Sequence, residues 1–150
     1  MIFDRTIEDV NAAFFIRADK VQKGKELTID DINTLERGTL TINTLNRIES
    51  KQAQLREILI EIGYGVGDIF NSVWDFNGIF KQEDFDRISQ NDQKLKDAFF
   101  VYSDTPKMSS NNYRLYSVIN DVEKILADIE KMIAEIKSNY RICGATVCGE

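Results

Sequence analysis

The spacing of apolar side chains along the chain predicts α-helix over most of its length. Apolar residues recur at steps of three and four positions, which places them on one face of a helix. This spacing predicts helices at about residues 6–22, 28–37, 42–62, 82–102 and 117–140. The pattern therefore indicates a mainly α fold, and we expect an elongated helical bundle with coiled-coil-like helices.

Residues at the predicted helix ends support these boundaries. Thr6 and Thr28 each stand three residues before an aspartate, which is the pattern of a capping box. Gly24, Gly38 and Gly63 follow the first three predicted helices, at the positions where helices commonly end. These signals predict where each of the N-terminal helices starts and stops.

Two segments interrupt the helical pattern. Residues 64–80 combine glycines with aromatic side chains and predict an irregular loop that contains a short β-strand. Residues 141–150 contain two glycines and predict an extended tail or hairpin. We expect a single domain, 1–150, which consists of N-terminal helices (1–63), this loop (64–80), two long helices (81–140) and the tail (141–150).

The last predicted helix carries a narrow apolar seam. A seam one residue wide is typical of a helix that pairs with one or two others, whereas a helix in a globular core usually has a broader apolar face. The partner is either helix 42–62 of the same chain, through Leu45 and Ile48, or the same helix in another copy. The seam residues predicted to lie in an interface are Val118, Val122, Ile125, Ile129, Met132, Ile136 and Tyr140.

Composition argues against catalysis. The chain has 150 residues, a net charge of -6 and no histidine, so it lacks the commonest general base and the commonest metal ligand. Its acidic balance disfavours nucleic acid and anionic membrane as partners, and no apolar run is long enough to span a bilayer. Cys143 and Cys148 lack histidine partners, and we expect them to be free thiols. We predict no catalytic residue, no cofactor and no metal site.

Carboxylate pairs are the strongest argument for an enzyme. Asp30–Asp31 and Glu83–Asp84 are residue types that a glycoside hydrolase needs. Both pairs lie at predicted helix starts, where the helix dipole favours negative charge, so helix capping is the preferred interpretation. The glycines between 63 and 67 follow a helix rather than a strand, which argues against a nucleotide-binding loop.

A five-residue pattern recurs along the predicted helices. It consists of a small polar or acidic residue, an apolar residue, Asn, Asp or Glu, usually a cation, and a second apolar residue. Residues 44–48, 84–88 and 121–125 carry it in full, and 31–35 lack the cation. We expect the cations to pair with acidic groups on neighbouring segments. Chance repetition among amphipathic helices is the alternative.

A set of short segments follows in a fixed order along nearly the whole chain. The segments are Asp4-Arg5-Thr6, Asp9-Val10, Gly38-Thr39-Leu40, Leu45-Asn46-Arg47-Ile48-Glu49, Trp74, Asp86-Arg87-Ile88 with Asn91, Thr105-Pro106, Asp121-Val122-Glu123-Lys124-Ile125-Leu126 and Gly149-Glu150. In their order and spacing they resemble a family of bacteriophage tail-fibre and baseplate proteins. That family usually has serine where this chain has Cys143 and Cys148, which implies small side chains rather than ligands there.

The resemblance implies a structural component of a phage tail or baseplate. Such a protein is made in the bacterial cytoplasm and resides in the virion, where it attaches or supports tail fibres through helix-mediated assembly. The implied partners are other tail proteins and further copies of the chain, with a trimer favoured.

The alternative function is recognition of a glycan or protein on the host surface. Tyr64 and Trp74, in the glycine-rich middle of the chain, are then the predicted contact residues. The chain also carries adjacent aromatic pairs, Phe14–Phe15 and Phe99–Phe100, whose side chains point about 100° apart on a helix. One member of each pair is therefore free to join either a second packing layer or a subunit interface.

Overall fold

A computed structural model describes residues 1–75, 77–107, 112 and 114–147, and for residues 140–147 it describes the backbone alone. This part of the chain is helical and contains no β-strand, so the predicted mainly α class is confirmed, whereas the short strand predicted within residues 64–80 is not found among those described. The helices are α1 (Ile7–Ile16), the π-helical turn η1 (Arg17–Val21), α2 (Ile29–Gly38), α3 (Ile42–Glu61), α4 (Gln82–Ala98) and α5 (Tyr116–Val147).

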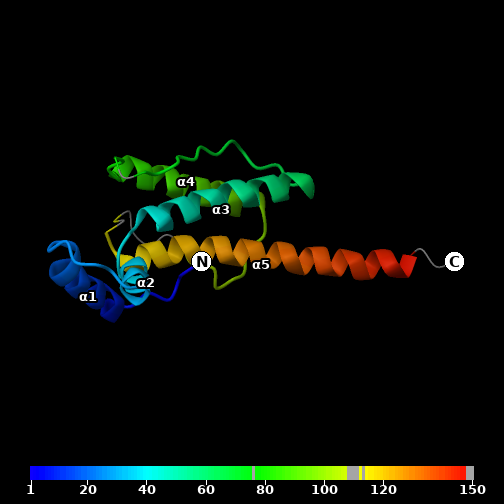
Figure 1. The fold of residues 1–150 in the computed structure, drawn as a ribbon. Coiled ribbons are helices and arrows are strands. Elements are labelled where there is room, and N and C mark those ends of the chain that lie inside the picture. Colours follow the sequence, from blue (N-terminus) through cyan, green and yellow to red (C-terminus); the bar gives the residue numbers. More distant parts are fainter. Residues whose placement is uncertain (76, 108–111, 113, 148–150) are drawn as a thin grey trace.

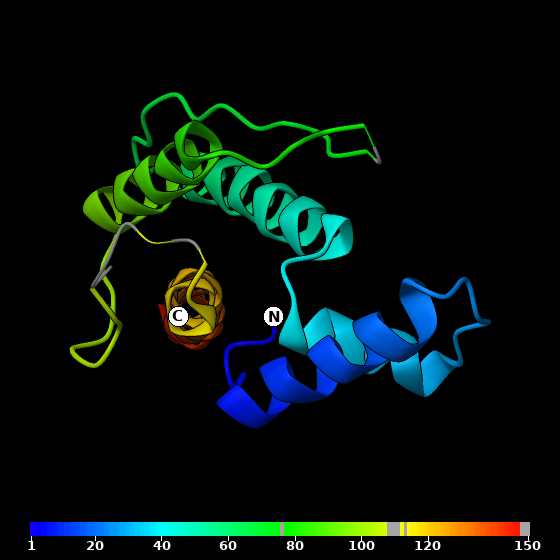
Figure 2. The same cartoon turned by 90° about the vertical axis from the view of Figure 1, so that its left-hand side faces the viewer.

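The helices form two parts. Helices α3, α4 and α5 pack on one another and make what we call the body. Helices α1 and α2 form an antiparallel hairpin, here called the arm, which lies across one end of the body (Figure 1). Viewed along α5, the pair α3–α4 lies above that helix and the arm lies to its right and below (Figure 2).

Local sequence explains how the helices of the arm begin. Thr6 accepts a hydrogen bond from the backbone N–H of Asp9, whose side chain accepts one from the Thr6 N–H, and Thr28 and Asp31 repeat the arrangement. Both capping boxes predicted from the sequence are therefore complete. Gly24, which follows η1, has a φ of 62°, a conformation that a side chain would strain.

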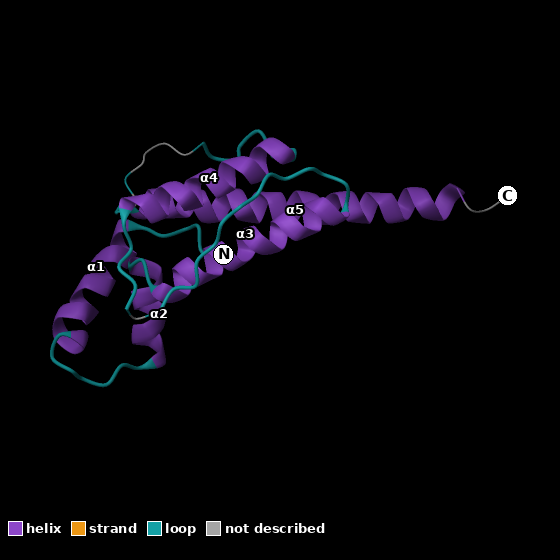
Figure 3. Cartoon of the chain, turned by 90° about the horizontal axis from the view of Figure 1, so that it is seen from above, coloured by secondary structure: helices purple, strands orange, loops and turns teal. Residues whose placement is uncertain are grey.

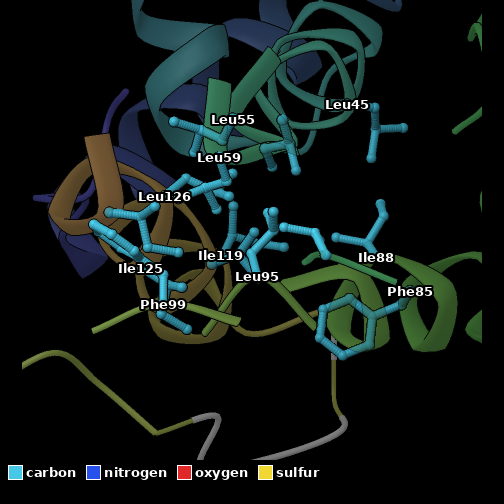
Figure 4. Packing of buried hydrophobic residues seen from close by; sticks show 14 of the residues in the cluster. Leu45, Leu55, Leu59, Phe85, Ile88, Leu95, Phe99, Ile119, Ile125 and Leu126 are labelled. Carbon is cyan, nitrogen blue, oxygen red and sulfur yellow. The ribbon is translucent and has the colours of Figure 1, made fainter. Parts of the chain in front are cut away.

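The hydrophobic core lies where the three helices of the body meet. Leu55 and Leu59 of α3, Leu95 of α4, and Ile125 and Leu126 of α5 are fully buried there (Figure 4). Burial of a large aliphatic side chain stabilises a fold by roughly 1.5–3 kcal/mol relative to an exposed one. This core is what fixes the three long helices on each other.

Two predicted boundaries are wrong. Helix α4 ends at Ala98 rather than near residue 102, because Phe99 adopts an extended backbone and its ring enters the core. Helix α5 continues to Val147, so the backbone of residues 141–147 is helical and not an extended tail or hairpin. The glycine at 144 does not end the helix, since one internal glycine costs only about 1 kcal/mol. Residues 148–150 lie outside the described part.

Long connections join the helices of the body. Residues 62–81, here called the middle loop, run from the end of α3 back to the start of α4 and contain no regular structure where they are described (Figure 3). Gly63, the second residue of this loop, has a φ of 94°, as expected for a glycine that ends a helix.

Candidate interaction surfaces

The arm exposes an unusual number of large apolar side chains. Only Ala13 and Asp31 are buried within α1 and α2. Isolated exposed apolar residues are ordinary, but a concentration of them on one element marks an interaction surface. The exposed apolar residues of these two helices are Ile7 (50% exposed), Phe14 (66%), Phe15 (71%), Ile29 (77%) and Ile32 (46%).

Helical spacing orders part of this apolar surface. Ile7, Val10 and Phe14 stand at positions i, i+3 and i+7, so they form one stripe along α1. Ala13 faces α2, and the stripe lies to one side of that contact. The ring of Phe15 points elsewhere, as the spacing of adjacent residues requires. The stripe is therefore a linear apolar surface beside the helix hairpin.

An apolar cavity continues the stripe. It has a volume of about 400 Å³ and lies between α1, residues 38–40 and the start of α5. Ile7 and Val10 line it on one side, and Leu115 and Ile119 on the other. Ile7 and Val10 belong to both features, so the stripe begins at the cavity and leads from it to Phe14.

A close approach of two backbones holds the arm together. A Cβ added to Gly38 at the end of α2 would stand 2.1 Å from the carbonyl oxygen of Asp9 and 2.4 Å from Cβ of Ala13. Only glycine therefore lets α1 and α2 pack at this distance. The sequence predicted Gly38 as a helix stop, but its contact with α1 is the stronger reason for a glycine there.

Ion pairs stabilise both ends of the arm. Arg37 donates to Asp9 across 3.1 Å, and this hydrogen bond lowers the pKa of Asp9. At the other end Lys20 donates to Asp31 across 2.5 Å and, with the Thr28 contacts, lowers the pKa of Asp31 to about 2. The arm is thus held at both ends while its apolar side faces solvent.

Glu123 of α5 connects the arm to the body. Its carboxylate is fully buried and accepts from Arg5, which precedes α1, and from Arg47 of α3 at 2.8 Å. Arg47 also reaches Glu36 of α2 at 3.3 Å. Asn120 donates to the carbonyl oxygen of Arg5 at 2.9 Å. This cluster links the arm to α3 and α5 by charge-assisted hydrogen bonds.

Glu49 of α3 connects the middle loop to the body. Its buried carboxylate accepts from Arg87 of α4 at 2.6 and 2.9 Å, from the indole Nε1 of Trp74 at 2.7 Å and from the backbone N–H of Ser72 at 2.5 Å. Asn46 adds a reciprocal pair of hydrogen bonds with the backbone of Trp74, at 2.8 and 3.0 Å. The loop therefore has a defined conformation without regular secondary structure.

The repeated pattern in the sequence accounts for both clusters. Arg47 and Arg87 pair with acidic groups on other helices, as expected, whereas Lys124 pairs with Asp128 one turn along its own helix. Glu123 is itself a member of the third repeat. The segments that carry the family resemblance thus supply the residues that attach the arm and the middle loop.

A third cluster of polar side chains is buried between α3 and α4. Gln52 donates to Asp92 Oδ1 at 2.7 Å and to the carbonyl oxygen of Ile88 at 2.9 Å, and Asn91 donates to Gln52 at 3.1 Å. Asp92 is fully buried and its Oδ2 has no hydrogen-bond partner. Burial raises the pKa of Asp92 to about 8. Gln52 thus joins α3 to α4 through buried hydrogen bonds.

The predicted ligand-contact residues are engaged inside the chain. Besides its bond to Glu49, Trp74 packs edge-on against Phe80 at 5.4 Å, and Tyr64 packs against Phe99 at 4.8 Å. The side chains that the middle loop exposes are different: Phe70 (68% exposed), Val73 (94%) and Ile79 (77%). Sequence reasoning missed them because their exposure depends on the polar contacts that fix the loop.

Most of the predicted interface seam lies in the core of a single chain. Four of its residues on α5 are fully buried against α3 and α4, as are Leu45 and Ile48 of α3, so the intramolecular partner accounts for this part of the seam. Met132 and Ile136 are partly buried at its edge. The backbone of Tyr140 continues α5, and its side chain lies outside the described part. The four fully buried residues are Val118, Val122, Ile125 and Ile129.

The acidic residues singled out in the sequence stand at helix starts in the structure. The described residues contain no group of three or more His, Cys, Asp and Glu side chains placed to hold a metal ion. Asp30–Asp31 and Glu83–Asp84 stand in the first turns of α2 and α4, as the capping interpretation predicts. The side chains of Cys143 and Cys148 lie outside the described part. No helix among the described residues is both long enough and apolar enough to cross a membrane.

Comparisons of this chain with known proteins found no match. No protein-family model, no curated protein and no solved structure matches the chain. The functional argument therefore rests on the surfaces described above and on the resemblance noted in the sequence.

Proposed function

We propose that this chain is a non-catalytic structural subunit of a phage tail or baseplate, where it binds neighbouring proteins and helps to attach or support tail fibres. The observation that carries the proposal is the apolar side of the arm. Five large apolar side chains on α1 and α2 are at least 46% exposed, beside a cavity with an apolar lining. Exposed apolar surface of this extent is costly for a monomer and is typical of a binding face.

The attachment of the arm supports a role in assembly. A binding surface is most effective when it is preorganised, because ordering a mobile segment costs affinity. Gly38 and the ion pairs Arg37–Asp9 and Lys20–Asp31 order the arm internally, and Glu123 orients it on the body. The arm thus offers its apolar side without a large conformational cost.

The phage setting rests on the sequence resemblance. The resembling segments contribute Arg5, Arg47 and Glu123 to one buried cluster and Glu49 and Arg87 to the other. Residues that fix how elements are joined are the ones expected to recur among proteins of one architecture. Residence in the virion is proposed on this resemblance.

The test is localisation combined with an arm variant. Immunogold electron microscopy of tailed particles from the strain that encodes the chain is expected to label the tail. Phe14→Ser, which changes an exposed side chain of the arm, is expected to remove the protein from particles, whereas Ser50→Ala on an exposed position of α3 is not. Particles that lack the wild-type protein would contradict the proposal.

Host-surface recognition is the second candidate. The observation in its favour is the middle loop, which is fixed by Glu49 and presents Phe70, Val73 and Ile79 to solvent. Binding of the purified protein to host cells, lost on Val73→Asp but kept on Phe14→Ser, would favour it over assembly through the arm.

A further inference from the structure

Phe14 offers an apolar side chain to a partner. It lies on the stripe that Ile7 and Val10 begin, and it is 66% exposed. Its ring packs edge-on against Phe15 at 6.3 Å, and Phe15 is itself exposed. Helix α1 begins near the start of α5 and runs outward from it (Figure 2), which places Phe14 away from the body. A partner that covers this ring would remove a large apolar surface from water.

The cavity at the start of the stripe has the size and the lining to hold an aromatic ring. Its volume is about 400 Å³, and Ile7 and Val10 form one wall while Leu115 and Ile119 form the other. An aliphatic cavity of about 150 Å³ is already large enough to bind benzene. The chain's own Phe14 stands seven residues beyond Ile7, about 10 Å along the helix, and does not line the cavity. The ring that fills it must therefore come from elsewhere.

Charge is distributed unevenly along α1. Residues 4–9, around its start, include three acidic residues and one arginine, a net charge of -2. Residues 17–25, which follow its end, include four cations and one aspartate, a net charge of +3. Two copies of this helix bring opposite charges together when they lie antiparallel and like charges together when they lie parallel. The charge pattern therefore favours a second, antiparallel copy of the same helix.

One antiparallel register brings the stripe and the cavity together. When Phe14 stands opposite the partner's Ile7, its ring lies at the mouth of the partner's cavity, and the two-fold axis repeats the contact. The same register sets Arg17 opposite the partner's Asp4. Arg17 forms no ion pair with the described residues, and the side chain of Asp4 is 72% exposed, with Arg37 at 3.3 Å. Apolar and charged contacts thus agree on one register.

We propose that the arm binds the arm of a second copy of this chain, with the α1 helices antiparallel and each Phe14 ring in the partner's cavity. Each copy gives the same side chain and receives it in the same cavity, and a contact of this kind closes as a dimer. Because α1 runs outward from its own α5, antiparallel pairing sets the two bodies at opposite ends of the helix pair (Figure 2). The inference deepens the proposed function, on whose binding role for the arm it rests, by naming the partner.

Sedimentation of matched variants tests the contact. Phe14→Ser and Phe15→Ser each remove an exposed ring from the same turn of α1, but the two side chains point about 100° apart and only Phe14 lies on the stripe. We expect the wild type and Phe15→Ser to form dimers at up to about 100 µM, and Phe14→Ser to dimerise at least roughly tenfold more weakly. Far-ultraviolet circular dichroism confirms that each variant keeps its helices.

Charge reversal tests the direction and the register. Arg17→Asp places a carboxylate opposite the partner's Asp4 and is expected to weaken the dimer several-fold at low salt. Adding Asp4→Arg to the same chain reverses both ends of the contact and is expected to restore dimerisation. In a parallel pair the two changes would not face each other, so the second change would restore nothing.

Four results would overturn the proposal. They are a wild-type chain that stays monomeric at about 100 µM, a trimer in place of the dimer, equal weakening by Phe14→Ser and Phe15→Ser, and no restoration by Asp4→Arg. If the chain is monomeric but particles still lose Phe14→Ser, the arm binds another protein and the proposed function stands without this dimer. If the chain dimerises through Phe14 but tails carry no label, the proposed function fails alone.

Discussion

At the scale of single residues, a few buried polar groups decide how irregular parts of the chain are fixed. Glu49 and Glu123 each accept hydrogen bonds from several groups far apart in the sequence. A buried carboxylate is costly to desolvate unless its partners satisfy it, and removing one partner leaves the other charge unpaired. Each of these two carboxylates therefore holds together segments that lie far apart in the sequence.

Replacing Glu49 is expected to release the middle loop. Glu49→Gln removes the nearer of the two charges that face Arg87 and leaves that guanidinium, which is 22% exposed, with only Asp84, at 3.6 Å, as an ionic partner. We expect a loss of about 2–4 kcal/mol in the free energy of unfolding and a red shift of the Trp74 fluorescence. Denaturant titration followed by tryptophan emission measures both.

The matched control is Asp68→Asn. Asp68 pairs with Arg56 at 2.9 Å, but its side chain is 86% exposed, so its ion pair is expected to contribute less than about 1 kcal/mol. Equal destabilisation by the two changes would show that Glu49 does not organise the loop.

Asp92 gives the protein a defined pH dependence. Its folded-state pKa of about 8 lies above the value of about 3.9 expected in the unfolded chain, so the fold binds a proton that the unfolded chain releases. The contribution of Asp92 is therefore fully favourable below about pH 4 and is lost as the pH rises to about 8. We expect the melting temperature of Asp92→Asn to exceed that of the wild type at pH 8 and to depend less on pH between 5 and 8.

The exposed Asp97 on the same helix provides the comparison. Asp97→Asn is expected to leave the slope of melting temperature against pH unchanged, because Asp97 is solvent-exposed. An Asp92→Asn variant with the same slope as the wild type would show that Asp92 does not retain its proton in the fold.

At the scale of elements, the sequence predicted helices well and their environments less well. Periodicity and capping residues located all five α-helices, because these signals act within a few neighbouring residues. The end of α4 was misplaced because Phe99 leaves the helix to enter a core formed by distant segments. The exposed residues of the middle loop could not be inferred, since Glu49, Arg87 and Asn46 fix that loop across long sequence separations.

The contact between α1 and α2 yields a prediction at this scale. Gly38→Ala is expected to force the two helices apart, because the new Cβ would stand far inside the contact distance of Asp9 and Ala13 backbone and side-chain atoms. We expect a destabilisation of about 1–3 kcal/mol, with faster hydrogen exchange confined to residues 7–38.

Gly65→Ala is the matched control for this substitution. Nothing lies within 4 Å of a Cβ added at Gly65, and its φ lies outside the left-handed range. It is expected to leave exchange in the arm unchanged. Equal effects of the two alanines would indicate that the arm does not depend on the close approach at Gly38.

At the scale of the whole molecule, the narrow seam of α5 is compatible with two environments, an interface between copies and the core of one chain. From Val118 to Ile133 the chain covers it with its own α3 and α4, and its residues there are buried without a second copy. The sequence pattern could not tell these environments apart, because a helix covered by two neighbours and a helix in an oligomer require the same spacing. The packing of α3 and α4 on α5 shows which of the two applies from Val118 to Ile133.

Ile129→Asp distinguishes the intramolecular seam from one shared between subunits. Ile129 is fully buried in one chain, so the change places an unpaired charge in its core and is expected to cost several kcal/mol whatever the protein concentration. Ala134→Asp, at an exposed position on the same helix, is expected to cost less than about 0.5 kcal/mol. Thermal unfolding at two protein concentrations measures the difference. If the loss caused by Ile129→Asp disappeared at high concentration, the body would depend on a second copy. A loss that is independent of concentration means that each chain builds this core alone.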